Sequence, residues 1–501
     1  MNADFDALTA RLAEHDDLRS AAALLRWDQA TYMPEGGSAA RGRQLATLEK
    51  LAHDRLTDPE LARLVDRVTP AAEREGDGSF AARLVRVARR DIERAARVPA
   101  AFVSAFATHR AELYDRWVRA RPANDFASVA PLLARTVEMS REYAGFFAPY
   151  AHVADPLIDL MDPDLKVTQL RALFDGLRAE LVPLVDAITR AAPADASCLH
   201  QTFPEADQLA FASAMATRFG YDWSRGRQDR TAHPFMTKFS LGDVRITTRV
   251  RPNDLAQALF CTLHEAGHAL YEQHIDRRYE ATLLAEGTSS GVHESQSRLW
   301  ENLVGRSLPF WKGQYPTLQA AFPAQLGGVP LDTFYRAINR VQRSLIRTDA
   351  DEVTYGLHVI MRFDFELELL EGKLAAADLA EAWRERARTD LGVVPGTDAD
   401  GCLQDVHWYD GFVGGAFQSY ALGNLMGAQF FAAALRAHPS IPREIEAGHF
   451  DTLRTWLADN VYVHGRARTP DELMLSATGA PLSTAPFMDY LRTKYGALYG
   501  L

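Results

Sequence analysis

The stretch FCTLHEAGHALYEQH, at residues 260–274, holds two histidines four residues apart and a glutamate directly after the first. On a helix, residues four apart share one face, so His264 and His268 can direct their imidazoles at one metal ion. Glu265 can then reach a metal-bound water without binding the metal, as in the H-E-x-x-H pattern of zinc hydrolases. A solvated polar face is the ordinary alternative, but the surrounding helix is apolar on nearly every side and its polar groups need partners.

A catalytic zinc takes three protein ligands and leaves one position open. The segment AEGTSSGVHESQSRLWENL (285–303) is the expected source of the third, because its glycines and serines predict a loop, an N-cap and a new helix from about Val292. Glu294 in the first turns of that helix is the favoured ligand, and Glu265 would take the proton of the attacking water. The alternatives are an ordinary capped helix start at HESQ and the competing side chains Glu286, His293 and Glu301.

Helices must position these residues, because most of the chain shows helical periodicity. The helix carrying the histidines is expected from about 254 to 275, after the breaker and cap residues Pro252, Asn253 and Asp254. Apolar residues also recur three and four apart in five other segments. These are 80–98, 127–147, 165–191, 333–347 and much of 352–372.

One hairpin is predicted within HPFMTKFSLGDVRITTRV (233–250), where β-branched residues follow the turn signal Gly242-Asp243. An edge strand just before the histidine helix can pair with a peptide backbone by strand addition. Asp243, Arg245 and Thr247 alternate along the second strand, so they share one face. That face is expected either to line a cleft or to be an ordinary exposed strand face.

Composition limits the class of protein. With 501 residues, 47% of them apolar and 24% charged, the chain is typical of a soluble globular protein. The net charge of -11 argues against nucleic acid or an anionic membrane as the main partner. No apolar run is long enough for a membrane span, and the acidic amino terminus has no secretory signal pattern. The three cysteines predict neither disulfides nor a thiolate metal site, so a cytoplasmic location is expected. Without repeats or linkers, residues 1–501 are predicted to form one domain.

The chain resembles the carboxypeptidase Taq family of zinc metallocarboxypeptidases over nearly its whole length. The opening RWDQATYMPEGGSAARGRQ and the close YLRTKYGALYG are similar to the ends of that family's chains. Several internal motifs occur in the family's order. Beside HEAGH these are HPF (233–235), DVRIT (243–247), HESQ (293–296), IRTDAD (346–351) and GCLQDVHW (401–408).

This resemblance implies a mainly α-helical, two-lobed body around a deep active-site groove with a small β-hairpin or sheet, similar to angiotensin-converting enzyme and neurolysin. It implies zinc, replaceable by cobalt, held by His264, His268 and Glu294, with Glu265 as the catalytic glutamate. It also implies a homodimer that releases single amino acids from peptide carboxyl termini, with broad specificity that excludes proline.

A carboxypeptidase must recognise a free carboxylate, which a guanidinium binds bidentately. Arg347 is the favoured anchor and Arg245 the second candidate; the ordinary alternative for Arg347 is a helix-surface pair with Asp349 or Asp351. His407 can donate to the developing oxyanion or be a structural histidine beside Trp408. His233 is a further candidate for substrate binding.

One segment departs from the family pattern. After the His-Trp pair the family has an aromatic stretch resembling GYFPTY, whereas this chain has GGAFQSY at 414–420. The carbonyl-polarising tyrosine is therefore open between Tyr420 and Tyr409. The segment LIDLMDPDLKV (157–167) is atypical as well, and could alter specificity.

Two other function classes compete. An endopeptidase or dipeptidyl-type peptidase would use the same metal chemistry without an anchor for the terminal carboxylate. A helical scaffold protein without turnover would have lost a ligand or the catalytic glutamate, and this chain keeps all of them.

Overall fold

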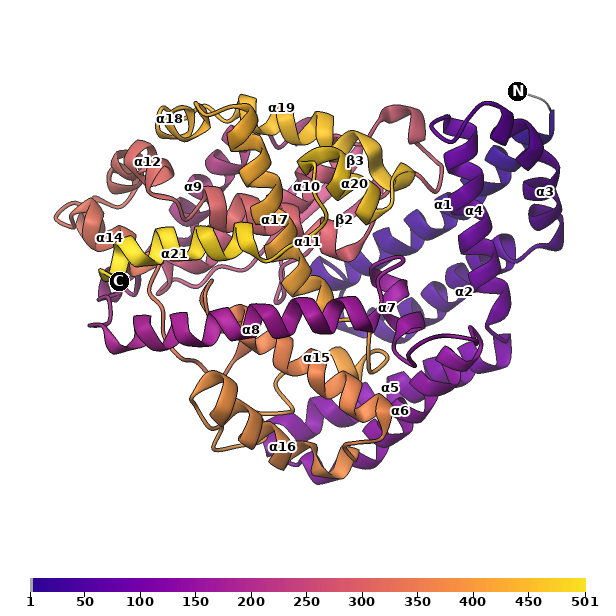
Figure 1. The fold of residues 1–501 in the computed structure, drawn as a ribbon, viewed down its shortest axis with the longest axis horizontal. Coiled ribbons are helices and arrows are strands. Elements are labelled where there is room, and N and C mark those ends of the chain that lie inside the picture. The colour runs from indigo at the N-terminus through magenta and orange to yellow at the C-terminus, as the bar shows by residue number, and fades with distance from the viewer. Residues whose placement is uncertain (1–2) are drawn as a thin grey trace. The chain divides into compact units, whose positions relative to one another are not determined.

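The computed structural model describes residues 3–501, which form two compact units. The first unit comprises the described residues up to Ala96 together with Ala196–Ile338 and Gln429–Pro481. The second comprises Arg97–Asp195, Asn339–Ala428 and Leu482–Leu501. Helices dominate both units (Figure 1). Among the described residues no helix is both long enough and apolar enough to span a bilayer.

The helices of the first unit begin and end as follows: α1 Ala3–Thr31, α2 Ser38–Leu56, α3 Pro59–Arg74, α4 Phe80–Arg97, α9 Glu205–Phe219, α10 Leu255–Gln273, α11 Ser290–Arg298, α12 Leu308–Ala321, α13 Pro323–Leu326, α14 Leu331–Ile338, α18 Ile441–Glu446, α19 Asp451–Asn460 and α20 Pro470–Thr478. A π-helical turn, Leu299–Val304, continues α11.

The second unit holds α5 Ala100–Ala123, α6 Ala130–Gly145, α7 Asp155–Met161, α8 Val167–Arg190, α15 Tyr355–Glu371, α16 Leu379–Arg386 and α21 Ala485–Tyr499. Helix α17, Gln418–Ala437, is divided between the two units.

The sheet has three strands and lies in the first unit. Its strands are β1 Gln228–Arg230, β2 Met236–Ser240 and β3 Asp243–Thr248, in the order β1-β3-β2. The predicted hairpin is β2 and β3, which pair antiparallel; β1 adds to β3 in parallel. Strand β3 is therefore central, and the prediction that its Asp243–Thr247 segment is an edge strand is wrong. The sequence QDR of β1 lacks β-branched residues, so no local sequence pattern predicted this strand.

Helix α10 packs on this sheet and against α9 (Figure 1). A fully buried apolar cluster joins the three elements, with Trp223 and Met236 at its border. Its members are Ala216, Tyr221, Val244, Ile246, Ala266 and Ala269. Because Ala266 and Ala269 belong to the face opposite the histidines, this packing fixes the direction in which the histidines point.

The predicted helices are confirmed over α4, α6, α8, α10 and α15, with ends shifted by a few residues. The helix expected over 333–347 is wrong beyond Ile338, where α14 ends. After it, backbone N–H groups donate to side chains of distant elements: Val341 to the Tyr499 hydroxyl and Arg347 to Gln404 Oε1. These tertiary bonds replace the helical ladder that the local pattern predicted.

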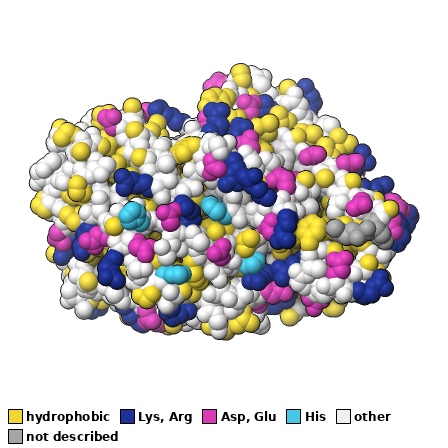
Figure 2. Space-filling view, turned by 90° about the horizontal axis from the view of Figure 1, so that it is seen from above, with side chains coloured by type: hydrophobic (Ala, Val, Ile, Leu, Met, Phe, Trp, Pro, Cys, Tyr) yellow, Lys and Arg dark blue, Asp and Glu magenta, His cyan; other side chains and the backbone are white. Residues whose placement is uncertain are grey.

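Charged side chains of both signs are interspersed on the molecular face in Figure 2. Among the described residues many charged side chains form ion pairs, such as Arg86 with Glu472 and Arg63 with Glu60. The excess of acidic residues is thus not gathered into one field on that face.

Candidate metal centre

Helices α10 and α11 carry the candidate ligands, and local sequence sets where each helix begins. The Asp254 side chain accepts from the N–H groups of Ala256 and Gln257 at the start of α10. Ser289 accepts from the N–H of Val292 and caps α11, as its Ser-Gly sequence predicted.

Gly267, inside the HEAGH motif, allows the two helices to approach closely. A Cβ at this position would lie 2.5 Å from the Gln296 carbonyl oxygen and 2.7 Å from the Ser297 Cα. Only a glycine fits there, and the short separation brings Glu294 of α11 over the histidine face of α10.

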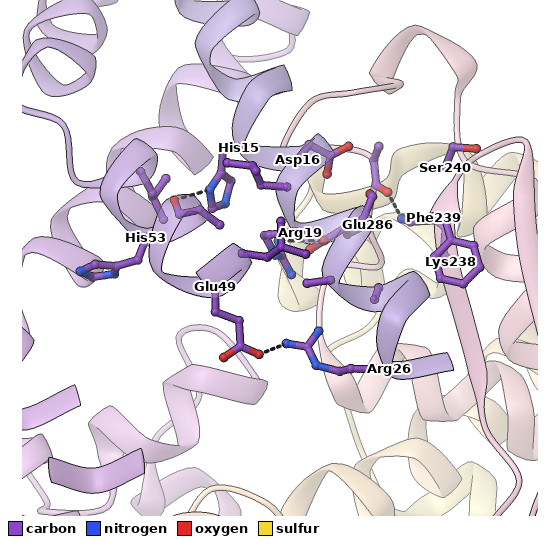
Figure 3. Close-up of a pocket in the computed structure, with 18 of the residues that line it drawn as sticks. His15, Asp16, Arg19, Arg26, Glu49, His53, Lys238, Phe239, Ser240 and Glu286 are labelled. Carbon is purple, nitrogen blue, oxygen red and sulfur yellow. Dashed lines mark hydrogen bonds and ion pairs between the residues drawn. The ribbon is translucent and has the colours of Figure 1, made fainter. Parts of the chain in front are cut away.

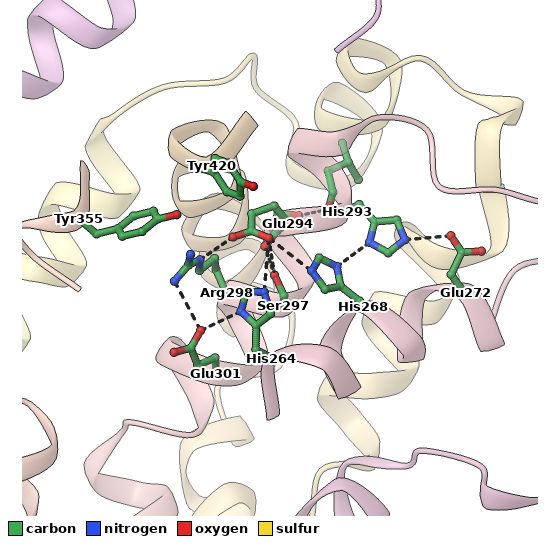
Figure 4. Close-up of polar contacts among 12 residues, drawn as sticks. His264, His268, Glu272, His293, Glu294, Ser297, Arg298, Glu301, Tyr355 and Tyr420 are labelled. Atoms are coloured by element: carbon green, nitrogen blue, oxygen red, sulfur yellow. Dashed lines mark hydrogen bonds and ion pairs between the residues drawn. The ribbon is translucent and has the colours of Figure 1, made fainter. Parts of the chain in front are cut away.

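His264, His268 and Glu294 converge on one point (Figure 4). Their ligand atoms lie within 4.8 Å of one another, and within residues 3–501 they form the one such group of three or more. The Nε2 atoms of His264 and His268 lie 3.6 and 3.4 Å from Glu294 Oε2. Tetrahedral coordination with metal bonds of about 2.0–2.1 Å puts neighbouring ligand atoms about 3.3–3.5 Å apart, so this donor set fits a divalent metal.

The three competing side chains lie elsewhere. Glu301 Oε2 is 2.9 Å from His264 Nδ1, and His293 Nδ1 is 2.6 Å from His268 Nδ1, so both contact the ring nitrogens that face away from Glu294 (Figure 4). Glu286 pairs with Arg19 at 3.0 Å.

Glu294 is itself held in place. Its Oε1 accepts from Arg298 Nε at 2.7 Å, and its Oε2 accepts from the Ser297 hydroxyl at 3.1 Å. Arg298 also lies 3.5 Å from Glu301, so one guanidinium joins both carboxylates. Sequence reasoning missed Arg298, although its position four residues after Glu294 on the same helix was a signal.

Glu265 on α10 and Glu301 on the π-helical turn differ in the pKa of their carboxyl groups. Burial raises the pKa of Glu265 to about 7; the His264 imidazole and the Met236 backbone N–H act in the opposite direction, while Glu294 and Glu301 add to the rise. For Glu301, burial also acts upward, but the hydrogen bond from His264 and the charge of Arg298 lower the pKa to about 2. Glu265 is therefore suited to exchange a proton near neutral pH, and Glu301 to stay ionised.

In the second unit the structure brings together three of the predicted substrate-binding residues. His407 Nε2 lies 3.0 Å from the Tyr420 hydroxyl, and the Arg347 guanidinium lies 5.0 Å from the centre of the Tyr420 ring. Sequence reasoning did not single out Asp405, which links this cluster, although it stands in the GCLQDVHW motif.

Arg347 is buried, in a short 3₁₀ turn, so the ordinary alternative of a helix-surface pair with Asp349 or Asp351 is wrong. Its Nε and Nη2 donate to Asp405 Oδ1, and its Nη1 donates to the Tyr355 hydroxyl. The buried Arg362 bonds the other oxygen of Asp405 at 2.5 Å. Two guanidinium groups thus share one carboxylate, which leaves excess positive charge beside Tyr420.

Arg245 and His233 belong to the first unit. Arg245 binds Asp243 through two hydrogen bonds, and its guanidinium lies over the rings of Trp27 and Phe239. His233 is exposed.

The two candidate tyrosines have different surroundings. Tyr409 is fully buried and its hydroxyl donates to the Cys402 carbonyl at 2.9 Å. Tyr420 is half-buried and lies beside His407. The polar environment of Tyr420 makes it the better placed of the two to donate to a substrate.

Segments 157–167 and 414–420 lie against each other. Asp162 of the first segment accepts hydrogen bonds from Gln418 Nε2 at 3.1 Å and from the Ser419 hydroxyl at 2.5 Å. Gly415 has a φ of 86°, and a Cβ there would lie 2.2 Å from the Leu157 carbonyl oxygen.

A cavity of about 400 Å³ lies in the first unit, between α1, α2, β2 and the segment 280–286 (Figure 3). Its charged lining includes Asp16, Arg19, Lys238 and Glu286. Lys238 also bonds Glu272 of α10, so the cavity wall connects to the helix that carries the histidines.

The chain matches known proteins along its whole length. The sequence profile of the Carboxypeptidase Taq (M32) metallopeptidase family matches residues 7–495. Thermostable carboxypeptidase 1 of Thermus thermophilus is 40% identical over 493 residues, 96% of each chain, and Carboxypeptidase 1 of Bacillus subtilis is 35% identical over 99% of this chain and 98% of its own. The solved M32 carboxypeptidase from Deinococcus radiodurans R1 superposes with a TM-score of 0.97, at 47% identity over 100% of both chains. This chain therefore belongs to the Carboxypeptidase Taq (M32) family and is a metallopeptidase by descent.

Proposed function

We propose that this protein is a zinc-dependent carboxypeptidase that releases single amino acids from peptides with a free carboxyl terminus. The observation that carries the proposal is the convergence of His264, His268 and Glu294 beside the buried Glu265. Two imidazoles, one carboxylate and an open position are the donor set of catalytic zinc, and cobalt accepts the same ligands.

When bound, the metal supplies Lewis acidity that lowers the pKa of a water and polarises the scissile carbonyl. Glu265 accepts the proton of the attacking water and returns it to the leaving amine. A pKa of about 7, raised by burial, suits Glu265 for both transfers near neutral pH. Tyr420, oriented by His407, donates a hydrogen bond to the oxyanion.

Arg347 binds the carboxylate of the substrate. The Asp405 and Tyr355 bonds hold its guanidinium in one orientation without using all five of its N–H groups. The positive charge that Arg362 adds beside the shared Asp405 favours an anion there. Arg245 is the weaker candidate, because Asp243 binds it alone and neutralises its charge, whereas Asp405 is shared by Arg347 and Arg362.

The peptide backbone pairs with β2. Thr247 N–H donates to the Phe235 carbonyl, so alternate residues Met236 and Lys238 direct their backbone groups to the outer edge of the sheet. The hydrogen bond from the Met236 N–H to the Glu265 carboxylate supports this edge as the binding strand. Strand addition binds any side chain and excludes residues without an N–H, which agrees with broad specificity and rejection of proline.

The family resemblance adds a likeness to angiotensin-converting enzyme and neurolysin, and a homodimer. The absence of any disulfide among Cys198, Cys261 and Cys402 supports a cytoplasmic location.

The decisive experiment incubates the zinc-loaded protein with one unstructured peptide, as free acid and as amide, and identifies products by mass spectrometry. Stepwise loss of single residues from the acid alone is expected. Internal cuts in both peptides would make the enzyme an endopeptidase, loss of residue pairs a dipeptidyl-type peptidase, and no cleavage of either would contradict the proposal. Zinc-loaded Glu265→Gln protein, prepared identically, controls for contaminating peptidases.

A further inference from the structure

His268 has an unusual partner for a metal-binding histidine. Its Nε2 faces Glu294 at 3.4 Å, and its opposite nitrogen, Nδ1, lies 2.6 Å from Nδ1 of His293 (Figure 4). His264, by contrast, has a carboxylate partner, Glu301, at the same ring position. A neutral histidine that binds metal through one nitrogen carries its proton on the other. His268 therefore donates through Nδ1, and His293 accepts.

That direction of donation determines the tautomer of His293. Because its Nδ1 accepts, its proton is on Nε2, which lies 2.9 Å from Glu272 Oε1. The other oxygen of Glu272 accepts from Lys238 Nζ at 2.7 Å. Lys238 also donates to the Ala285 carbonyl. In the series of hydrogen bonds from His268 to the Lys238–Glu272 ion pair, each contact therefore joins one donor to one acceptor.

The surroundings hold the His293 ring in this position. Glu272 is only 4% exposed, and its Oε1 also accepts from the Gly287 N–H at 3.2 Å. A Cβ at Gly287 would lie 2.7 Å from Cδ2 of His293, so the loop can contact the ring only with glycine there. The Tyr271 ring packs on the same imidazole, with 5.2 Å between ring centres.

We propose that His293 is a positioning residue, which fixes the tautomer and ring orientation of His268 and is itself fixed by Glu272 and Lys238. The proposal rests on the proposed metal site. It assigns to the HESQ histidine a role behind the ligand rather than at the metal, and it brings Glu272 and Lys238 into the support of the centre. Removing such a partner typically costs 10–100-fold in metal affinity.

The test measures zinc dissociation constants of metal-free protein by competition with a chromophoric chelator. His293→Leu, which fills similar space without polar atoms, should weaken zinc binding about 10–100-fold. His293→Gln should recover most of the affinity, because its amide oxygen can accept from His268 and its amide nitrogen can donate to Glu272. The absorption spectrum of the cobalt-loaded protein should change in the leucine variant and return in the glutamine variant.

His274→Leu is the matched control. His274 directly follows α10, the helix that carries His268, and its Nδ1 bonds the Leu270 carbonyl, outside the series of hydrogen bonds described above. Its replacement should leave the zinc dissociation constant unchanged. Melting temperatures of the metal-free variants report whether the fold persists. If His293→Leu does not fold, Gly287→Ala displaces the same ring while every polar side chain stays, and it should weaken zinc binding too.

Three results would overturn the proposal. Wild-type affinity in His293→Leu would mean that the partner is dispensable. An equal loss in the leucine and glutamine variants would mean that the hydrogen bonds do not carry the effect. A loss as complete as that of His268→Ala would make His293 a ligand. Failure of the metal site itself is distinguishable, because His268→Ala and Glu294→Ala would then leave zinc binding unchanged.

Discussion

The Asp162 carboxylate accepts a hydrogen bond of 2.5 Å from the Ser419 hydroxyl, and Ser419 directly precedes Tyr420 in the chain. Asp162 is fully buried, and it also accepts from Gln418. Segments 157–167 and 414–420 therefore form one polar contact.

Asp162→Ala should lower the free energy of unfolding by about 2 kcal/mol, since it leaves two buried donors without their charged acceptor. It should also lower kcat roughly tenfold, because Ser419, which directly precedes Tyr420, loses its hydrogen-bond acceptor. The zinc dissociation constant should stay the same. Denaturant unfolding, steady-state kinetics and chelator competition measure the three quantities. Asp175→Ala, at an exposed carboxylate of the same unit, is the control. An unchanged kcat in a folded Asp162 variant would disprove the link to Tyr420.

Gly267→Ala should destabilise the protein and weaken zinc binding, because its Cβ would meet the α11 backbone at 2.5 Å. We expect a loss of about 1–3 kcal/mol in the free energy of unfolding and a rise of at least roughly tenfold in the zinc dissociation constant. Gly42→Ala has open space around its Cβ on an exposed helical position, so it should stabilise by about 0.5–1 kcal/mol. Equal effects of the two substitutions would contradict the close-contact argument.

Glu265→Gln should keep zinc and lower kcat by a factor on the order of 10²–10⁴, because the glutamine cannot accept the proton of the water. Metal analysis after dialysis and single-turnover kinetics test the two parts separately. A variant that cannot bind zinc would assign Glu265 to the metal, and a fully active variant would remove its role as the base.

Arg347→Lys should raise KM for free-acid peptides at least about tenfold with a smaller change in kcat, since an ammonium loses the bidentate geometry but keeps a charge beside Asp405. Arg245→Lys is the paired variant, and it should change KM little because Asp243 alone neutralises the charge of Arg245. The opposite ranking would move the carboxylate anchor to Arg245.

Asp16 makes stability depend on pH. Burial raises its pKa from 3.8 to about 6, Glu286 acts in the same direction, and Lys238 and Arg19 act against it. The folded state therefore holds this proton more tightly than the unfolded state, and the resulting stability, full below about pH 4, is lost as the pH rises through about 6.

Asp16→Asn removes that loss. Its melting temperature should exceed that of the wild type by a margin that grows from pH 4 to pH 7. Thermal denaturation across this range is the measurement. Asp17→Asn, at the exposed neighbouring position, should show a margin that does not change with pH. A margin that shrinks as the pH rises would contradict the raised pKa of Asp16.

Local sequence was a sufficient guide wherever a helix or cap decides the geometry. The spacing of His264 and His268 places both on one helix face, and the serines before Val292 predicted the start of α11. It failed where long-range contacts replace local ones. The residues after Ile338 have a helical pattern, yet their N–H groups bond side chains such as Tyr499 and Gln404.

By itself, therefore, the sequence determined the family, the mainly helical class and the set of residues able to hold a metal. Only the tertiary structure decided which of four candidates near α11 faces the two histidines. The contact of α11 with Gly267 turns Glu294 toward Nε2 of both rings, while Glu301 and His293 reach the opposite nitrogens and Glu286 pairs with Arg19. The physical reason is that the rotation of one helix about its axis against another depends on side-chain packing between them, which a single sequence does not encode locally.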